Sequence, residues 1–265
     1  MTREWNATAY HKVSGPQTSW GQKVLDRLTV RGDESVIDAG CGSGRLTGEL
    51  MGRLPRGRLV ALDRSWNMLI TARANLRPAF GDRVGFVQVS LPQMPFAEAV
   101  DLVFSTATFH WVRDHDALFG NICRSLKPGG RLVAQCGGGP NLAQAHRLAE
   151  QVMHRPPFES HFASWAGIWE FASAETTAGR LGDAGFEDVV TSIEPAPTGF
   201  SSEADYREFV ATVIYHPHMA MLPTAELKQA FLDQVTELAS RDDPPFTLDY
   251  WRLNMEARRP QKAGH

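Results

Sequence analysis

The stretch that decides the fold is Val36-Ile37-Asp38-Ala39-Gly40-Cys41-Gly42-Ser43-Gly44-Arg45. A short β-branched run ends there in an acidic residue and passes through alternating glycines into a helical pattern. Glycines in such a turn supply positive φ angles and let a ligand approach the backbone closely. The next apolar run, 58–62, ends at a second acidic residue, Asp63. Together these features predict a nucleoside-cofactor site at the carboxyl ends of neighbouring parallel strands.

The spacing of the glycines distinguishes between cofactors. The dinucleotide fingerprint G-x-G-x-x-G would need its last glycine at position 45, where the chain has Arg45. The carboxylate of Asp38 would repel a pyrophosphate, but it can bind the ammonium of an amino-acid-bearing cofactor. Asp63 can accept both hydroxyls of a ribose. An NAD-dependent oxidoreductase is therefore disfavoured, and an ordinary glycine turn with a solvent-facing aspartate is the simplest alternative.

Composition narrows the class of protein further. The 265 residues carry a net charge of -3, spread along the chain, which disfavours a nucleic-acid partner. The start, Met1–Asn6, has no apolar leader, and no run is long enough to span a membrane, so we expect a soluble, cytoplasmic protein. Cys41, Cys123 and Cys136 lack C-x-x-C pairing and are expected to be reduced thiols.

No metal site is expected. His216-Pro217-His218 invites a metal interpretation, as do His146, His154 and His161. The spacing of these histidines repeats no known ligand pattern, and a histidine pair around a proline is more often a turn.

Alternating strand and helix patterns predict an α/β fold with a doubly wound, mostly parallel sheet. The expected strands are 35–39, 58–62, 84–89, 100–105, 131–136, 187–193 and, with an uncertain register, 248–257. The expected helices are 65–74, 118–126 and 176–184, with further helices over 200–240. We expect one compact unit: a core over 1–136, a lid insertion over 137–175, and a completing segment over 176–265 that includes a helical substrate cap at about 200–243.

Motifs in order along the first half carry a family resemblance. They are Trp5-Asn6 with Tyr10 and Gln17, the glycine loop Asp38–Gly44, the segment Asp63–Leu69, the segment Ser105–Val112, and Leu126-Lys127-Pro128-Gly129-Gly130. The chain resembles class I S-adenosylmethionine (SAM) methyltransferases of the small-molecule type, in particular the trans-aconitate, malonyl-carrier and juvenile-hormone-acid group. The resemblance implies a seven-stranded Rossmann-like sheet with helical lid insertions.

The resemblance also implies a set of cofactor contacts. They are Tyr10, Gln17, Asp38, Gly40, Gly42, Gly44, Asp63, Arg64, Met68, Ser90, Leu91 and Ser105. Asp38 and the glycines would hold the methionine part, Asp63 the ribose, and Arg64 and Met68 the adenine. Ser90 stands where the family usually has an acidic residue, which is a departure from its pattern. Tyr10 and Gln17 would belong to an N-terminal segment that covers the cofactor. A surface helix packed against the domain explains these two residues equally well.

The resemblance implies that the protein is a SAM-dependent methyltransferase, which transfers a methyl group from SAM to an acceptor and releases S-adenosylhomocysteine. Carboxyl O-methylation of a small molecule is the first choice, with His110 as a base or an orienting group. Trp111, Trp165 and Trp169 would form an apolar wall, the last two at one helical turn from each other, although such pairs are more often core. O-, N- or C-methylation of another metabolite and a SAM-binding inactive accessory protein stay open, as does the oligomeric state. Ser105-Thr106-Ala107-Thr108 stands in place of an Asn/Asp-Pro-Pro-Tyr/Phe motif, which disfavours amide and base nitrogens as acceptors.

Overall fold

The computed structural model describes residues 15–262, with side chains from residue 19 onward. Contacts between Cα atoms divide the chain into two compact units. Unit 1 contains residues up to Gly139, Trp169–Glu194 and the segment from Arg252, and unit 2 contains Pro140–Ile168 and Pro195–Trp251. This division differs from the single compact unit expected from the sequence, because the chain leaves the sheet twice and the two excursions have a core of their own.

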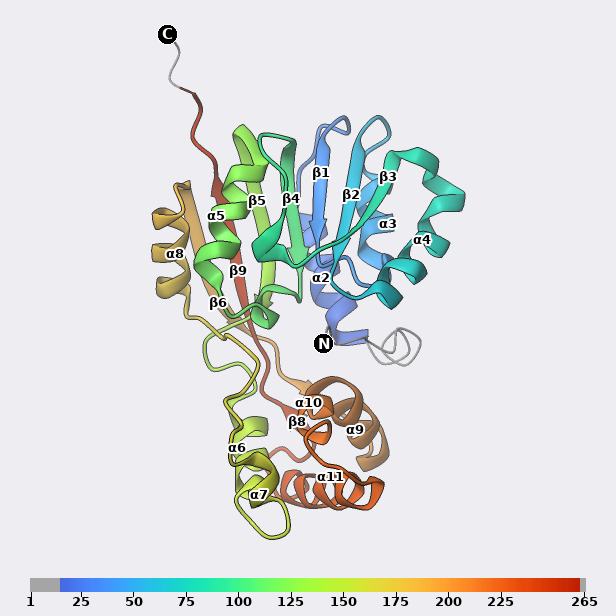
Figure 1. The fold of residues 1–265 in the computed structure, drawn as a ribbon, viewed down its shortest axis with the longest axis vertical. Coiled ribbons are helices and arrows are strands. Elements are labelled where there is room, and N and C mark those ends of the chain that lie inside the picture. Colours follow the sequence, from blue (N-terminus) through green and yellow to red (C-terminus); the bar gives the residue numbers. More distant parts are fainter. Residues whose placement is uncertain (1–14, 263–265) are drawn as a thin grey trace. The chain divides into compact units, whose positions relative to one another are not determined.

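Within residues 15–262, the larger sheet has seven strands, in the order β3-β2-β1-β4-β5-β9-β6 (Figure 1). They are β1 (Ser35–Ala39), β2 (Arg58–Asp63), β3 (Val84–Gln88), β4 (Val100–Thr106), β5 (Leu126–Gly137), β6 (Glu187–Pro195) and β9 (Trp251–Arg258). The first five are parallel, and β9 runs antiparallel to β5. The chain passes from β1 outward to β3 and then returns to β4 on the other side of β1. The carboxyl end of β1 is therefore the switch point of the sheet, where open α/β folds bind ligands.

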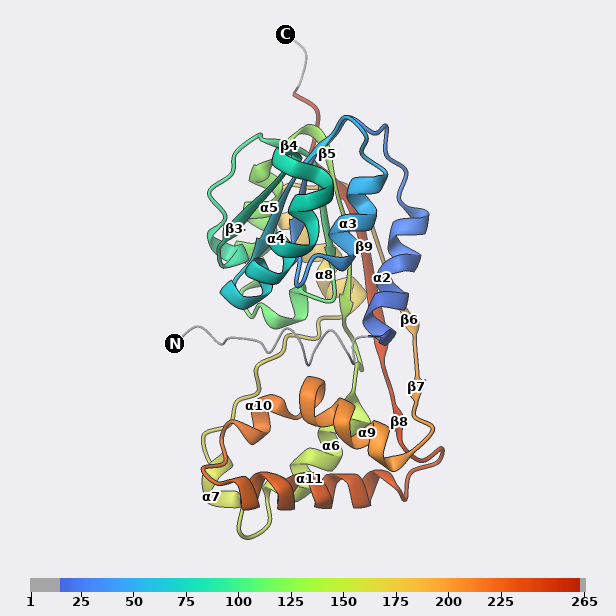
Figure 2. The ribbon, with the colours of Figure 1, turned by 90° about the vertical axis from the view of Figure 1, so that its right-hand side faces the viewer.

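Helices cover both faces of this sheet (Figures 1 and 2). On one face lie α2 (Gly15–Arg27), α3 (Arg45–Gly52) and α4 (Trp66–Phe80), and on the other lie α5 (His115–Ser125) and α8 (Ala174–Asp183). Short 3-10 turns, η1 (Gly81–Arg83), η2 (Leu91–Gln93) and η3 (Phe109–Trp111), connect helices and strands. The prediction of a doubly wound α/β fold is confirmed.

Unit 2 is mainly helical. Its helices are α6 (Ala143–Met153), α7 (Glu159–Phe162), α9 (Glu203–Phe209), the π-helical turn η4 (Val210–Ile214), α10 (His216–Met219) and α11 (Ala225–Ala239). Two short antiparallel strands, β7 (Thr198–Gly199) and β8 (Thr247–Leu248), accompany them. Phe158, Tyr215 and Phe231 are fully buried and pack edge to face, so this unit has an aromatic core of its own.

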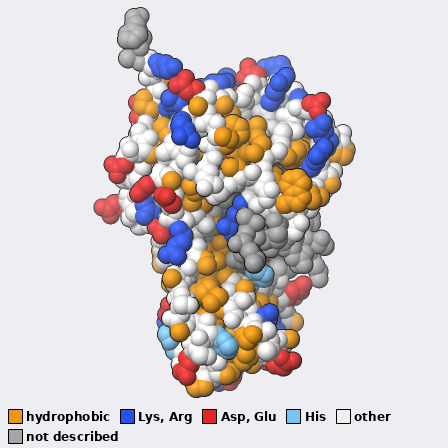
Figure 3. Space-filling model, viewed as in Figure 1, with side chains coloured by type: hydrophobic (Ala, Val, Ile, Leu, Met, Phe, Trp, Pro, Cys, Tyr) orange, Lys and Arg blue, Asp and Glu red, His pale blue; other side chains and the backbone are white. Residues whose placement is uncertain are grey.

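Charges of both signs occur on the face of the protein shown in Figure 3, and neither sign gathers into one continuous stripe there. This distribution agrees with the small net charge of -3. In the described part of the chain, no helix is both long enough and apolar enough to cross a membrane.

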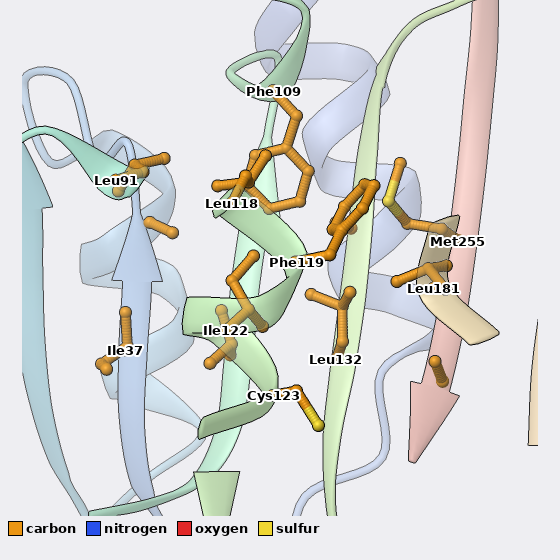
Figure 4. Packing of buried hydrophobic residues seen from close by; sticks show 14 of the residues in the cluster. Ile37, Leu91, Phe109, Leu118, Phe119, Ile122, Cys123, Leu132, Leu181 and Met255 are labelled. Atoms are coloured by element: carbon orange, nitrogen blue, oxygen red, sulfur yellow. The ribbon is translucent and has the colours of Figure 1, made fainter. Parts of the chain in front are cut away.

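The central parallel strands β1, β4 and the second half of β5 are buried on both faces, which explains their continuous apolar runs. Neighbouring residues on β1 point to opposite sides: Val36 packs toward α2, α3 and α4, and Ile37 toward α5. Figure 4 shows the second of these cores, where Phe109, Phe119 and Leu132 meet between η3, α5 and β5. Phe109 is fully buried, so η3 is attached to this core at its first residue.

The largest differences from the sequence-based expectation concern β5, β9 and α4. The segment Lys127–Gly130, expected as a loop, belongs to β5, because that strand begins at Leu126 and its pairing with β4 shifts register between Val100 and Leu102. The strand expected over 248–257 is divided between β8 and β9, which pair in different sheets. The helix predicted at 65–74 is confirmed and continues to Phe80, with the Ser65 Oγ accepting from the Met68 N–H at its N-cap.

Candidate functional site at the carboxyl edge of the sheet

The glycine loop follows β1 directly and is attached to β2. Gly40, Gly42 and Gly44 have φ angles of 88°, 54° and 83°, which favour glycine. The N–H groups of Gly40 and Cys41 donate to the carbonyl of Leu62 at 2.8 and 2.9 Å. The loop is therefore fixed at the end of β2, next to Asp63.

The surroundings of these glycines differ. A Cβ atom on Gly40 would lie 2.2 Å from the Thr108 Oγ1, and one on Gly44 would lie 2.8 Å from a methyl carbon of Leu76. A Cβ atom on Gly42 would meet no heavy atom within 4 Å among the described residues. Gly40 and Gly44 are thus required by packing inside the protein, whereas Gly42 faces space that a ligand can occupy.

Asp63 connects the end of β2 to the glycine loop. Its Oδ2 accepts the Gly42 N–H at 3.0 Å, and its Oδ1 accepts the Ser65 N–H at 2.8 Å. Burial raises the pKa of this carboxyl, against the lowering effect of the two backbone hydrogen bonds. Each carboxylate oxygen has a second acceptor position, so Asp63 can also accept the two hydroxyls of a ribose.

Asp38 is buried at the end of β1, where it is 3% exposed. Burial raises its pKa to about 7, the Thr47 hydroxyl that donates to Oδ2 at 2.6 Å opposes the shift, and the charge of Asp63 adds to it. The sequence reasoning missed Thr47. The available signal was that a buried carboxylate needs a donor, and the helix after the glycine loop is the nearest element that can supply one.

The remaining predicted cofactor residues occupy different environments. Arg64 and Ser90 are exposed, whereas Met68 and Leu91 are buried in the packing of unit 1. The buried Ser105 hydroxyl donates to the Ala39 carbonyl at 2.6 Å, so its side chain joins β4 to β1. Tyr10 lies outside the described residues. Gln17 lies in α2, but its side chain is outside the described part, so the roles of both stay predictions.

His110 lies in η3, just beyond the carboxyl end of β4. Its Nδ1 accepts the Gly137 N–H at 3.2 Å, and its carbonyl accepts the Glu170 N–H at 2.9 Å. Burial lowers the pKa of the His110 imidazole well below its usual value, with the charges of Arg252 and His115 adding to the effect. A neutral ring whose Nδ1 is an acceptor carries its proton on Nε2. His110 is therefore set up to donate a hydrogen bond from Nε2.

Aromatic rings from two segments of unit 1 surround His110. Its ring centroid lies 5.3 Å from Trp111 and 5.7 Å from Phe171, and Trp169 lies 5.8 Å from Trp111. All four side chains are partly exposed. The sequence reasoning missed Phe171 as a member of this group, because residues 169–171 lie in neither a helix nor a strand and no sequence pattern places them beside His110.

The predicted helical spacing of Trp165 and Trp169 is wrong. Residues 163–173 form no helix, and Gly167 has a φ of 69°, which interrupts any helical run. Trp165 belongs to unit 2, where its ring lies 4.8 Å from the ring of His218, while Trp169 belongs to unit 1. A role of either tryptophan toward an acceptor stays a prediction.

The histidines give no sign of a metal centre in the described residues. Within residues 19–262, no group of three or more His, Cys, Asp or Glu side chains has an arrangement that can hold a metal ion. His218 lies among aromatic rings in α10, and burial lowers its pKa to about 3.

Comparisons with known proteins agree with this geometry. A family described as "Methyltransferase domain" matches residues 37–134. Trans-aconitate 2-methyltransferase of Methylobacterium nodulans is 33% identical over 62% of this chain and 61% of its own length. The chain thus matches less than two thirds of this curated relative.

Solved structures share the fold. A putative methyltransferase from Bacillus halodurans superposes with a TM-score of 0.62 at 20% identity, covering 92% of this chain and 100% of that chain. Haemonchus contortus phosphoethanolamine N-methyltransferase 2, in complex with phosphomonomethylethanolamine and S-adenosylhomocysteine, gives a TM-score of 0.62 at 17% identity, covering 96% of this chain and 57% of that chain.

The sheet order, the glycine loop and the acidic end of β2 define the class I methyltransferase fold. Residues 37–134 match the methyltransferase-domain family, in agreement with the family resemblance found in the sequence.

Proposed function

We propose that the protein is a SAM-dependent methyltransferase that methylates a carboxylate of a small organic acid. The observation that carries the proposal is the hydrogen bond between Asp63 and Gly42 at the switch point of the sheet, in a domain whose sequence matches methyltransferases. It joins the acidic residue that would hold a ribose to the glycine that faces open space.

The residues present fit the cofactor. The open side of Gly42 leaves room for the methionine part, and the carboxylate of Asp38 can hold its ammonium. Asp63 would accept the ribose hydroxyls through its remaining lone pairs. Arg64 and Met68 would flank the adenine, with Ser90 and Leu91 near its amine.

When bound, SAM supplies an activated methyl group on a positively charged sulfur. The protein has to place a nucleophile in line with that group and exclude water. A carboxylate is already ionised at neutral pH and needs no general base. The neutral His110, with its proton on Nε2, suits the other role predicted for it: it would donate a hydrogen bond to the acceptor and orient it, next to the rings of Trp111 and Trp169.

The choice of acceptor is supported by the relatives, which include trans-aconitate 2-methyltransferases. The mixed surface charge favours a small molecule over a nucleic acid. We expect a reducing, cytoplasmic location, in agreement with the free thiols of Cys41, Cys123 and Cys136.

The test uses the full chain with SAM that carries a labelled methyl group, incubated with panels of organic acids, amines and phenols. We expect calorimetric titration to show SAM binding. One of the acids should give a labelled methyl ester, which is recognised because mild alkaline hydrolysis releases labelled methanol from it. A labelled amine or phenol product would instead show that the protein catalyses N- or O-methylation of another metabolite. Tight SAM binding without product from any panel would favour the inactive accessory protein, and NAD binding without SAM binding would refute the proposal.

A further inference from the structure

Three side chains that the proposed reaction does not use form a bridge behind His110. They are His115 in α5, Glu170 in the segment that precedes α8, and Arg180 in α8. The Arg180 Nη1 donates to the Glu170 Oε1 at 2.9 Å and to the His115 Nδ1 at 3.0 Å. Because Nη1 carries two hydrogens, it can serve both acceptors at once.

The bridge reaches the His110 turn at two carbonyls. The His115 Nε2 lies 3.1 Å from the Phe109 carbonyl oxygen, and the Glu170 N–H donates to the His110 carbonyl at 2.9 Å. Since the His115 Nδ1 accepts from an arginine, the proton of its neutral ring is on Nε2, where it donates to Phe109. Burial lowers the pKa of His115, in agreement with a neutral ring.

The same bridge fixes the aromatic neighbours of His110. Glu170 lies between Trp169 and Phe171 in the sequence. Its backbone and its carboxylate are both held by hydrogen bonds, and these bonds keep the two neighbouring rings beside His110 and Trp111. The ion pair is partly shielded from water, with side-chain exposures of 27% for Arg180 and 32% for Glu170. Asp116 approaches Arg180 only to 3.9 Å and is 86% exposed, so it adds little.

We propose that Arg180 is a positioning residue, which holds the His110 ring and the rings around it in the orientation that the acceptor meets, acting through His115 and Glu170. This inference rests on the proposed function. Arg180 itself would touch neither cofactor nor acceptor.

The main test compares Arg180→Ala with the wild-type chain. We expect kcat/KM for the acceptor to fall by about 10- to 100-fold, the loss that a misplaced reacting geometry causes, with the Kd for SAM changed less than about twofold. A second readout needs no acceptor: in protein labelled with ¹⁵N-histidine, the ring signals of His110, assigned with His110→Gln, should shift in Arg180→Ala. Arg180→Lys keeps a cationic donor and should recover part of both effects.

Arg259→Ala is the matched control. Arg259 pairs with Glu98 at 2.9 Å, is 22% exposed, and contacts Leu126 at the start of β5, whereas His110 contacts Gly137 at the opposite end of that strand. We expect it to lower the melting temperature of the protein without shifting the His110 signals or changing kcat/KM. Glu170→Gln keeps the backbone bond to His110 and loses only the charge, so it replaces Arg180→Ala if that variant does not fold, with a smaller change in the same direction.

Unchanged His110 signals and unchanged kcat/KM in a folded Arg180→Ala variant would overturn the inference, as would equal kinetic losses in Arg259→Ala. A wild-type chain that methylates no acid would instead refute the proposed function, while the His110 signals would still report on the bridge.

Discussion

The Asp63 carboxylate and the Gly42 backbone N–H are joined by a hydrogen bond of 3.0 Å. The acidic end of β2 therefore helps to set the position of the glycine loop that follows β1. A side chain expected to hold the ribose also shapes the part of the protein expected to hold the methionine.

Asp63→Ala should weaken SAM binding by about 1 to 3 kcal/mol, since the ribose bonds are lost and the loop loses its anchor. Calorimetric titration measures the change. Asp63→Asn is the matched control: it keeps acceptor capacity on one oxygen and should retain part of the affinity. An unchanged Kd in the alanine variant would mean that the ribose lies elsewhere.

Gly42→Ala and Gly40→Ala should separate binding from folding. At position 42 the added methyl group enters open space, so we expect weaker SAM binding with a modest strain cost of about 1 to 2 kcal/mol from the positive φ. At position 40 the methyl group would collide with Thr108, so we expect a larger fall in melting temperature. Thermal unfolding and SAM titration of both variants check this, and equal SAM affinity in Gly42→Ala and wild type would contradict it.

The stability of the cofactor-free protein should depend on Asp38. Its pKa is raised to about 7 in the folded state, above its unfolded value of about 3.9, so the folded state holds an extra proton between these pH values. The free energy of unfolding should therefore contain a contribution that falls as pH rises through this window. Urea unfolding across the window measures it, and Asp38→Asn should remove that contribution. An equally steep dependence in Asp38→Asn would assign it to other groups.

SAM binding should in turn favour the ionised form of Asp38. Below about pH 7 the cofactor must displace a proton, so its Kd should rise by up to about tenfold per pH unit as pH falls. Titration in buffers of different ionisation enthalpy would detect the released proton. Asp38→Asn should bind more weakly and release none, and proton release that persists in this variant would place the titrating group elsewhere.

The pH dependence of kcat/KM should show no step from the ionisation of His110. Because its pKa is lowered well below the usual value, kcat/KM at saturating SAM should stay free of a histidine step between about pH 6 and 8. His110→Ala should lower kcat/KM roughly 10- to 100-fold through the lost hydrogen bond to a charged acceptor. His110→Gln places a donor near the position of Nε2 and should recover more than His110→Asn. A rate that rises with a pKa near 6.5 would instead make His110 a general base.

Local patterns sufficed for β1 and for the glycine loop. The predicted bounds of β1 agree with the structure, because a buried parallel strand is a continuous apolar run and Gly40 ends it with a positive φ. Ser65 marks the start of α4 for an equally local reason, its N-cap hydrogen bond to Met68.

Such local patterns could not predict contacts between segments that lie far apart in the sequence. Thr108 faces Gly40 across 68 residues, and Arg180 faces His115 across 65. Nothing in the sequence around Phe171 distinguishes an aromatic residue beside His110 from one in a core. The spacing of Trp165 and Trp169 misled for the same reason, since helical spacing has meaning only where a helix forms.

The place of β9 has a consequence for how the chain is made. It follows every other strand of the large sheet in sequence, yet it lies between β5 and β6. During synthesis the sheet therefore keeps a gap, with the edge of β5 unpaired, until residue 258 has left the ribosome. An open edge of this kind invites pairing with other chains. Premature termination before β9 should thus give a product prone to aggregation, even though every residue of the methyltransferase domain at 37–134 is already present.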